Sequence, residues 1–234
     1  MRLSNHQILT NTYHRRQLRQ VSPDQAQYLE QALDELARLL SGAATWELSG
    51  GLAIAATIGR FYRMHDDIDI NVDIEDLNEF VAHARKQGYA LFGRGLIVRT
   101  SLNTKIDVYK ALSTTEAATG KHRHLRLARV DPDGLIVPHR QLTDYIDLYP
   151  YTIEKNEIVD LLTNQRAPLS HRYASSYTTL SGNVVRNVDL RLVARGKRMR
   201  FWPADMLDRK LIREYLQHHA ENGNSGAQQA TPTR

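Results

Sequence analysis

The stretch WELSGGLAIAATIGRFYRMHDDIDINV, residues 46–72, contains the pattern that decides the fold. A short segment at about Thr45–Ser49 predicts a β-strand, and the pair Gly50-Gly51 ends it. The run LAIAATI is rich in alanine, which favours a short buried helix over a strand. Residues 67–73 alternate strictly between polar and apolar side chains and predict a second strand. The stretch is therefore interpreted as strand, glycine turn, helix and strand.

Two carboxylates share one face of the second predicted strand. Side chains alternate along a β-strand, so Asp67 and Asp69 point to one side while Ile68 and Ile70 point into the core. Two carboxylates about 7 Å apart on one strand repel each other and gain nothing for the fold. A divalent cation removes that repulsion, and Mg²⁺ prefers carboxylates together with substrate phosphates. The pair predicts a magnesium site, and the alternative is a wet strand face with incidental acids.

The glycine pair lies where a strand passes into a helix. Glycine lets the backbone come close to a ligand, and the start of a helix offers unpaired N–H groups to phosphate oxygens. Ser49 adds a hydroxyl group at the same place. We therefore expect Ser49, Gly50 and Gly51 to bind a nucleotide, and the simpler alternative is that the two glycines only form a tight turn.

The spacing of these elements resembles the DNA-polymerase-β-like nucleotidyltransferase superfamily, and most closely its aminoglycoside 2″- and lincosamide nucleotidyltransferase families. The resemblance covers about residues 46–112. It implies an α/β fold with a mixed β-sheet flanked by helices, followed by a smaller α+β C-terminal region. The residues that carry it are Gly50, Gly51, Ala53, Gly59, Arg60, Arg63, His65, Asp66, Asp67, Ile68, Asp69 and Ile70.

The resemblance also implies a third metal-binding carboxylate, flanked by apolar residues on a later strand. Two positions fit this pattern: Asp107 in TKIDVYKA and Asp147 in YIDLYPY. The spacing in related enzymes favours Asp107, and the aspartate that is not a ligand would be a solvent-facing strand residue. We therefore predict that Asp67, Asp69 and Asp107 are the catalytic, metal-binding residues.

The chemistry that the resemblance implies is transfer of a nucleoside monophosphate to a hydroxyl group. The donor would be ATP, giving AMP, or another nucleoside triphosphate. Two Mg²⁺ ions would stabilise the attacking and leaving oxygens. Asp67 and Asp69 would bridge both ions, and Asp107 would complete the ion on the acceptor side.

Three basic residues are candidates for binding the nucleotide phosphates. Arg60 or Arg63 would neutralise the β- and γ-phosphates, and the alternative for each is an ion pair with Asp66. Lys210 lies in PADMLDRKLIREYL, which resembles the C-terminal helix from which a lysine reaches toward phosphate in such enzymes; otherwise it is a solvent-facing lysine. His65 precedes the aspartate pair, where it would either support the metal ligands or pack in the core.

Composition divides the chain into four segments. Residues 1–21 are polar and predict an N-terminal arm, and residues 22–120 would form the nucleotidyltransferase core. Residues 121–219 would form a C-terminal α+β region that completes the cleft. Residues 220–234 lack large apolar side chains and predict a disordered tail.

Composition also limits the class of protein. The chain has no cysteine, which excludes disulfides, thiolate metal sites and cysteine nucleophiles. No stretch is apolar enough for a signal peptide or a membrane-spanning helix, so we expect a cytoplasmic protein without a membrane partner. The formal net charge is +5, and the excess of basic residues falls in the second half, where it would face an anion such as triphosphate or RNA.

Three functions remain open from the sequence. The favoured one is transfer to a small-molecule hydroxyl acceptor, as in the antibiotic-modifying families, although a polycationic aminoglycoside would need an acidic pocket that the sequence does not show. The second is a toxin-like enzyme acting on RNA or protein, and the third is a non-catalytic nucleotide-binding module. RNA contacts would come from one basic segment and from a hairpin predicted over residues 183–202: Arg123, Arg126, Arg129, Lys197, Arg198 and Arg200.

Overall fold

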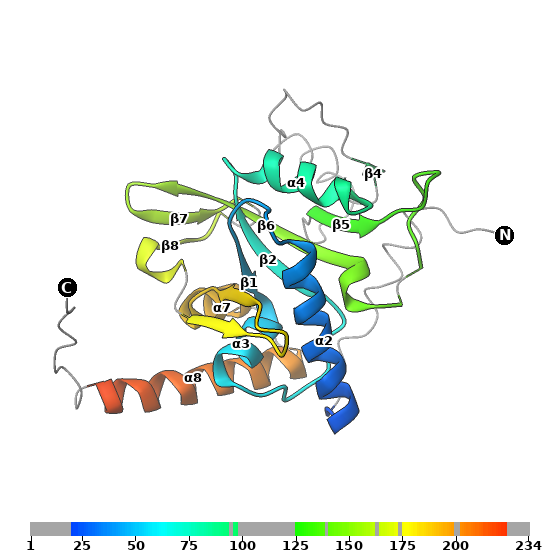
Figure 1. Ribbon diagram of the computed structural model, residues 1–234. Helices are drawn as coiled ribbons and strands as arrows, with labels where there is room; N and C mark the ends of the chain where they lie inside the picture. The colour runs from blue at the N-terminus through cyan, green and yellow to red at the C-terminus, as the bar shows by residue number, and fades with distance from the viewer. Residues whose placement is uncertain are drawn as a thin grey trace, which may run out of the picture.

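A β-sheet of ten strands forms the centre of the computed structural model (Figure 1). Its strands are β1 (Trp46–Ser49), β2 (Ile68–Asp73), β3 (Tyr89–Gly93), β4 (Leu96–Ile97), β5 (Leu125–Arg129), β6 (Tyr145–Glu154), β7 (Glu157–Asp160), β8 (Arg166–Pro168), β9 (Ser175–Thr178) and β10 (Val184–Asn187). The structure describes residues 20–93, 96–97, 125–138, 140–161, 164–172, 175–198 and 202–223.

The sheet is mixed, with the order β4-β3-β5-β6-β2-β1-β10-β9, and β7 extends it by pairing with β6 and β8. β2 runs parallel to β6 and antiparallel to β1, while β5 runs antiparallel to β6. The predicted α/β fold with a mixed sheet flanked by helices is therefore confirmed. β5 and β6 lie between β3 and β2, so the sheet includes strands from both sides of residue 120, and the domain division there stays a prediction.

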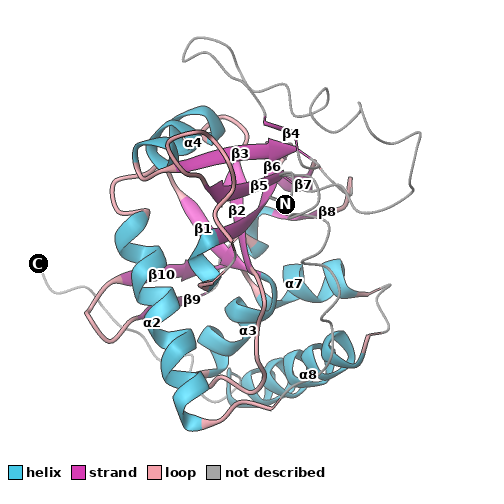
Figure 2. Cartoon of the chain, turned by 90° about the vertical axis from the view of Figure 1, so that its right-hand side faces the viewer, coloured by secondary structure: helices cyan, strands magenta, loops and turns pink. Residues whose placement is uncertain are grey.

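Helices cover both faces of the sheet. They are α2 (Pro23–Leu39), α3 (Gly50–Ile58), α4 (Leu77–Lys86), α7 (Leu190–Lys197) and α8 (Pro203–Gly223), with short 3₁₀ helices η2 (Leu142–Asp144) and η3 (Leu169–His171). Figure 2 shows α2 and α4 on one side of the sheet, with α7 on the other side and α8 below it. The face that carries the polar residues of β2 is thus framed by α7 and α8.

The main core forms between α2 and the sheet. Ser22 and Gln25 make a reciprocal capping box that starts α2, and Pro23 stands at the first helical position. The leucines that follow at helical spacing are fully buried against the apolar side of the central strands. The residues of this layer include Leu29, Leu33, Leu36, Leu48, Ile68, Ile70 and Leu148. Burial of this side fixes the register of β2, because a shift by one residue would turn its aspartates into the core.

The region predicted as a hairpin is a helix instead. Residues 190–197 form α7, and the Asp189 side chain accepts a hydrogen bond from the Arg191 backbone N–H at 2.7 Å to begin it. Leu190, Val193 and Lys197 are buried on one face, at helical rather than strand spacing. The prediction was wrong because the valine-rich alternation of β10 was carried past Asp189, which caps the helix.

Two further expectations concern parts of the chain with little or no description. Most of the predicted N-terminal arm and most of the predicted tail lie outside the described residues, although α8 runs on to Gly223.

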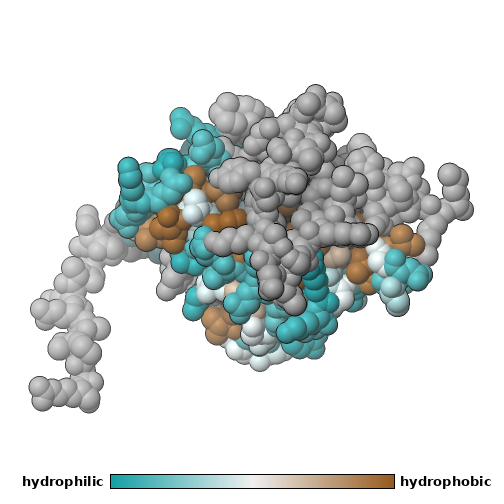
Figure 3. All heavy atoms as spheres, turned by 90° about the horizontal axis from the view of Figure 1, so that it is seen from above, coloured by the Kyte–Doolittle hydropathy of each residue, from teal (hydrophilic) through white to brown (hydrophobic). Residues whose placement is uncertain are grey.

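Among the helices that are described, none combines the length and apolar character needed to cross a membrane. The described surface visible in Figure 3 mixes hydrophilic and hydrophobic residues.

Candidate active site

Three carboxylates meet at the start of two parallel strands. Asp69 on β2 lies directly opposite Asp147 on β6, and Asp67 immediately precedes β2. Each of the three offers a carboxylate oxygen, and these oxygens all lie within 4.8 Å of one another. Asp67 is exposed, Asp69 is half-buried and Asp147 is buried. We call Asp67, Asp69 and Asp147 the carboxylate cluster.

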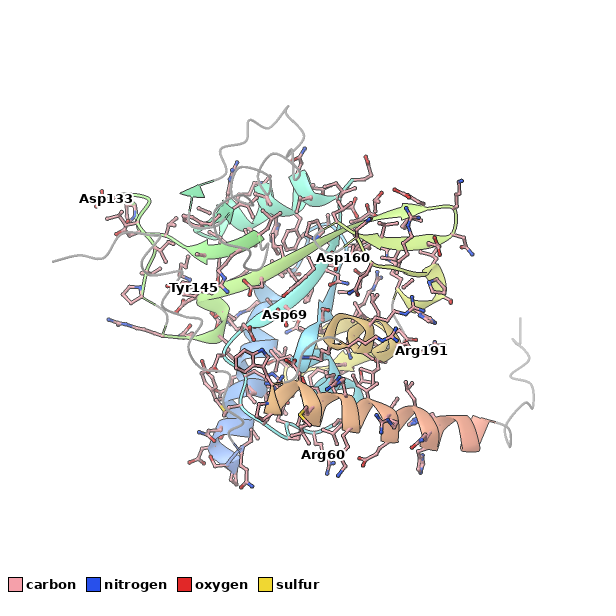
Figure 4. The ribbon with its side chains drawn as sticks, turned by 180° about the vertical axis from the view of Figure 1, so that it is seen from behind. Arg60, Asp69, Asp133, Tyr145, Asp160 and Arg191 are labelled. Atoms are coloured by element: carbon pink, nitrogen blue, oxygen red, sulfur yellow. The ribbon has the colours of Figure 1, made fainter. Side chains whose placement is uncertain are left out.

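The alternating pattern of both strands produces this arrangement. Ile68 and Ile70 on β2, and Ile146 and Leu148 on β6, have no exposed surface and point to the opposite side of the sheet. The aspartates between them must therefore face the side framed by α7 and α8. In Figure 4, Asp69 lies at this face, close to the centre of the molecule.

The structure brings Asp147, the alternative candidate for the third carboxylate, close to Asp67 and Asp69. Asp107 lies outside the described residues, so its predicted role is not tested by the geometry. The spacing argument favoured Asp107 because it counted positions along the chain. Among the described strands, β6 runs parallel to β2 and places Asp147 opposite Asp69.

One guanidinium contacts the carboxylate cluster. Arg126 on β5 stands opposite Asp147 on β6, and its Nη2 donates to Oδ2 of Asp147 at 2.8 Å while its Nε donates to Oδ1. The cluster therefore combines three carboxylates with one guanidinium that contacts Asp147. A divalent cation of hard character matches this set of oxygen ligands.

Gly50 is required by the carboxylate beside it. Its φ is +62°, and a Cβ atom at this position would lie 1.8 Å from Oδ2 of Asp69. A side chain would therefore be both strained and in collision with the cluster. Ser49 is the residue before α3, and within the described structure its side chain makes no capping hydrogen bond to the helix. The first turn of α3 thus begins directly beneath the Asp69 carboxylate.

Gly51 is required by two other side chains. A Cβ atom there would lie 2.2 Å from Nη2 of Arg63 and 2.5 Å from Cε1 of His65. His65 is 3% exposed, and its Nε2 has no hydrogen-bond partner within the described structure. Burial, followed by the charge of Arg63, holds the pKa of His65 well below its usual range, so the ring is neutral. His65 therefore fills the space over the glycine turn as an uncharged group.

Arg63 is bound to α8 rather than to Asp66. Its Nε and Nη2 each donate to the Asp208 carboxylate at 2.9 Å, and the Tyr62 hydroxyl donates to the same group at 2.7 Å. Lys197 at the end of α7 lies 2.8 Å from Asp208 and 2.7 Å from Asp205. We call Arg63, Lys197, Asp205 and Asp208 the neutral network, because its two cations balance its two anions.

Sequence reasoning missed the neutral network. Its cations hold the pKa of Asp208 below the usual range against the opposing effect of burial. One sequence signal was present: Asp205 and Asp208 are three residues apart, on the helical face that also buries Leu211 and Ile212. Two acids on an apolar helix face indicate buried ion pairs, yet the partners come from segments far away in the chain.

The other two predicted phosphate ligands lie elsewhere. Arg60 is exposed just beyond α3, and Figure 4 shows it on the far side of α8 from Asp69. Lys210 is 69% exposed, with its Nζ 3.8 Å from Glu214 one turn along α8. Lys210 follows Asp208 by two residues and so points to a different side of the helix. Lys210 thus occupies the solvent-facing position that the sequence analysis gave as its alternative.

Comparison with known families matches part of the chain. Residues 31–118, less than half of the chain, match the family model described as aminoglycoside-2''-adenylyltransferase. This match confirms the resemblance to the nucleotidyltransferase superfamily and indicates a nucleotidyltransferase enzyme. A search of curated proteins found no match.

Solved structures with a related chain arrangement were also found. The lincomycin-bound lincosamide antibiotic adenylyltransferase LnuA is 13% identical, with 83% of this chain and 98% of that chain covered and a TM-score of 0.47. ANT(2")-Ia in complex with adenylyl-2"-tobramycin is 16% identical, with 84% and 90% covered and a TM-score of 0.44. An antigenic nucleotidyltransferase-like protein from Paracoccidioides brasiliensis is 14% identical, with 82% and 77% covered and a TM-score of 0.41. These likenesses are too distant to assign a substrate.

Proposed function

We propose that this chain is a Mg²⁺-dependent nucleotidyltransferase that transfers AMP from ATP to a hydroxyl group of a small-molecule acceptor. The observation that carries the proposal is the carboxylate cluster beside the Gly50 turn. Three carboxylate oxygens lie within 4.8 Å of one another on a polar sheet face, where like charges repel. The unfavourable repulsion between these carboxylates is explained if they bind a cation that the reaction needs.

The residues present fit a divalent metal. Mg²⁺ takes oxygen ligands and is usually held by one or two carboxylates together with substrate phosphates. Asp67, Asp69 and Asp147 supply such oxygens, and we propose Asp147 as the third ligand in place of Asp107, which the sequence analysis favoured. Bound metal would stabilise negative charge on the attacking and leaving oxygens of a displacement at phosphorus.

The chain's own groups would bind and orient the substrates. The backbone at Gly50 and Gly51, at the start of α3, would receive phosphate oxygens, and Ser49 would add its hydroxyl at the same edge. A carboxylate of the cluster on the acceptor side would accept the proton of the attacking hydroxyl. Arg63 would act on the phosphates only indirectly, because Asp208 already holds its guanidinium against Gly51.

ATP is proposed as the donor because the matching family is described as an adenylyltransferase. The positions of the basic residues in the fold favour a small-molecule acceptor over RNA. Arg126 is buried against Asp147, Arg129 lies 3.4 Å from Glu35, and Lys197 is buried in the neutral network. Arg126 and Lys197 are buried in ion pairs and so are not part of a phosphate-binding surface, while the Arg129 side chain remains 36% exposed. Arg198 is exposed, while Arg123 and Arg200 lie outside the described residues.

The test is to incubate the protein with each labelled nucleoside triphosphate, Mg²⁺ and a cell extract, and to locate the label. The proposal expects label from ATP in the small-molecule fraction, with stoichiometric pyrophosphate, and none without Mg²⁺. Label in RNA or protein would favour the toxin-like alternative instead. Nucleotide binding without pyrophosphate release under any of these conditions would favour the non-catalytic module.

A further inference from the structure

Arg126 and Asp147 form an ion pair whose geometry is fixed from several sides. The register of β5 against β6 places the two residues directly opposite each other. Their side chains are only 10% and 3% exposed, and two parallel N–H groups of the guanidinium contact the two carboxylate oxygens. The guanidinium carbon also lies 5.6 Å from the centre of the Tyr145 ring, on the same side of β6 as Asp147. The plane of the Asp147 carboxylate is therefore held, not merely neutralised.

A carboxylate held in this way can still bind a metal. Each carboxylate has about four lone-pair sites, and a two-pronged arginine contact uses one on each oxygen. One oxygen of Asp147 lies within 4.8 Å of an oxygen of Asp67 and of an oxygen of Asp69, so the same carboxylate borders both the guanidinium and the cluster. Arg126 and a cation can thus contact Asp147 at the same time, from different sides.

We propose that Arg126 is a positioning residue, which orients Asp147 so that one of its carboxylate oxygens faces the metal site. This inference rests on the proposed function, because it assumes that Asp147 is a metal ligand. This inference and an explanation from charge alone predict different effects of Arg126 substitutions on metal binding. The positive charge of Arg126 repels a divalent cation, so electrostatics alone expects tighter metal binding when that charge is removed and no change when it is kept. Orientation expects weaker binding in both cases, because the two-pronged contact is lost.

The structure offers a matched control at the other end of β6. Arg172 donates to the buried carboxylate of Glu47 at 2.9 Å, and its guanidinium carbon lies 5.4 Å from the Tyr151 ring. This pair repeats the arrangement of arginine, carboxylate and β6 tyrosine, but its carboxylate is not part of the carboxylate cluster. Arg172→Lys therefore alters a pair between an arginine and a buried carboxylate, joined by one hydrogen bond rather than two, without touching Asp147.

The experiment measures Mn²⁺ affinity by isothermal titration calorimetry, with thermal melting as a check on folding, for wild type, Arg126→Lys, Arg126→Gln and Arg172→Lys. We expect both Arg126 variants to bind Mn²⁺ about 10- to 100-fold more weakly, and Arg172→Lys to bind it like wild type. In an Asp147→Asn background, Arg126→Lys should cause no further loss, because the group it orients is gone.

Wild-type Mn²⁺ affinity in either folded Arg126 variant would overturn the inference, as would tighter binding by Arg126→Gln. Failure of both Arg126 variants to fold, while Arg172→Lys folds, would also overturn it and make Arg126 a structural residue. Failure of the proposed function is a different result: wild type itself would bind no Mn²⁺, with or without ATP.

Discussion

The carboxylate cluster and the neutral network lie on the two sides of one glycine turn, yet their charges are arranged differently. Asp69 of the cluster lies against Gly50, and Arg63 of the network lies against Gly51. The network pairs two cations with two anions, so its charges are balanced within the chain. The cluster instead brings three carboxylate oxygens within 4.8 Å of one another, with the Arg126 guanidinium bound to one of the three carboxylates.

This difference separates a structural ion pair from a binding site. Burying charge is costly, and a fold can meet that cost only with partners of opposite sign. Asp208 meets it with Arg63, Lys197 and the Tyr62 hydroxyl. The carboxylate cluster gathers like charges in one place, which is the arrangement expected of a site that binds a divalent cation. The predictions below alter one cluster while leaving the other intact.

The largest expected effect is on catalysis. Asp69→Asn should reduce nucleotidyl transfer on the order of 100-fold or more, because the site loses a charge that holds the metal. The fold should be as stable as wild type or more so, since one of three repelling carboxylates is removed. Asp133→Asn is the control, because Asp133 is exposed and lies far from Asp69 in Figure 4. Pyrophosphate release measures transfer, and near-wild-type rates for Asp69→Asn would contradict the assignment.

A second change decides between the two candidates for the third carboxylate. Asp147→Asn should abolish transfer, whereas Asp107→Asn should leave it largely intact, because Asp147 is the residue opposite Asp69. The melting temperature must be measured alongside, since neutralising Asp147 leaves the buried Arg126 guanidinium without its full partner. Loss of transfer in Asp107→Asn, with activity kept in Asp147→Asn, would restore the original assignment.

The neutral network should respond in stability rather than in metal binding. Asp208→Asn leaves two buried cations poorly compensated and should lower the free energy of unfolding by about 3–5 kcal/mol. Urea denaturation followed by circular dichroism measures this change. A decrease in the free energy of unfolding below about 1 kcal/mol would mean that the neutral network is solvated in solution. It would then not stabilise the packing of α8 against the Arg63 segment.

The smallest effect is expected at Lys210. Lys210→Met removes only an exposed contact with Glu214 and should change the free energy of unfolding by less than about 0.5 kcal/mol. Transfer should be unchanged, because the side chain points away from the side of α8 that carries Asp208. A marked rise in the KM for ATP in this variant would show that Lys210 reaches the nucleotide after all.

Local signals in the sequence were enough for part of this picture. The capping residues of α2, the glycine turn and the alternation around Asp69 each act within a few neighbouring residues, and the structure shows the helix, turn and strand that they predict. The choice of Asp147 depended on which distant strand pairs with β2, and no local pattern contains that register. Asp208 was missed for the same reason, because α8 packs against both the Arg63 segment that follows α3 and Lys197 at the end of α7.

Mn²⁺ titration of wild type, Asp69→Asn and Asp208→Asn tests the central claim most directly. Calorimetry with a non-hydrolysable ATP analogue, below the melting temperature of each variant, compares the two clusters in one measurement. We predict that wild type and Asp208→Asn bind Mn²⁺ with similar affinity and that Asp69→Asn loses this binding. Equal binding of Mn²⁺ by wild type and Asp69→Asn would contradict the claim that the carboxylate cluster forms the metal site.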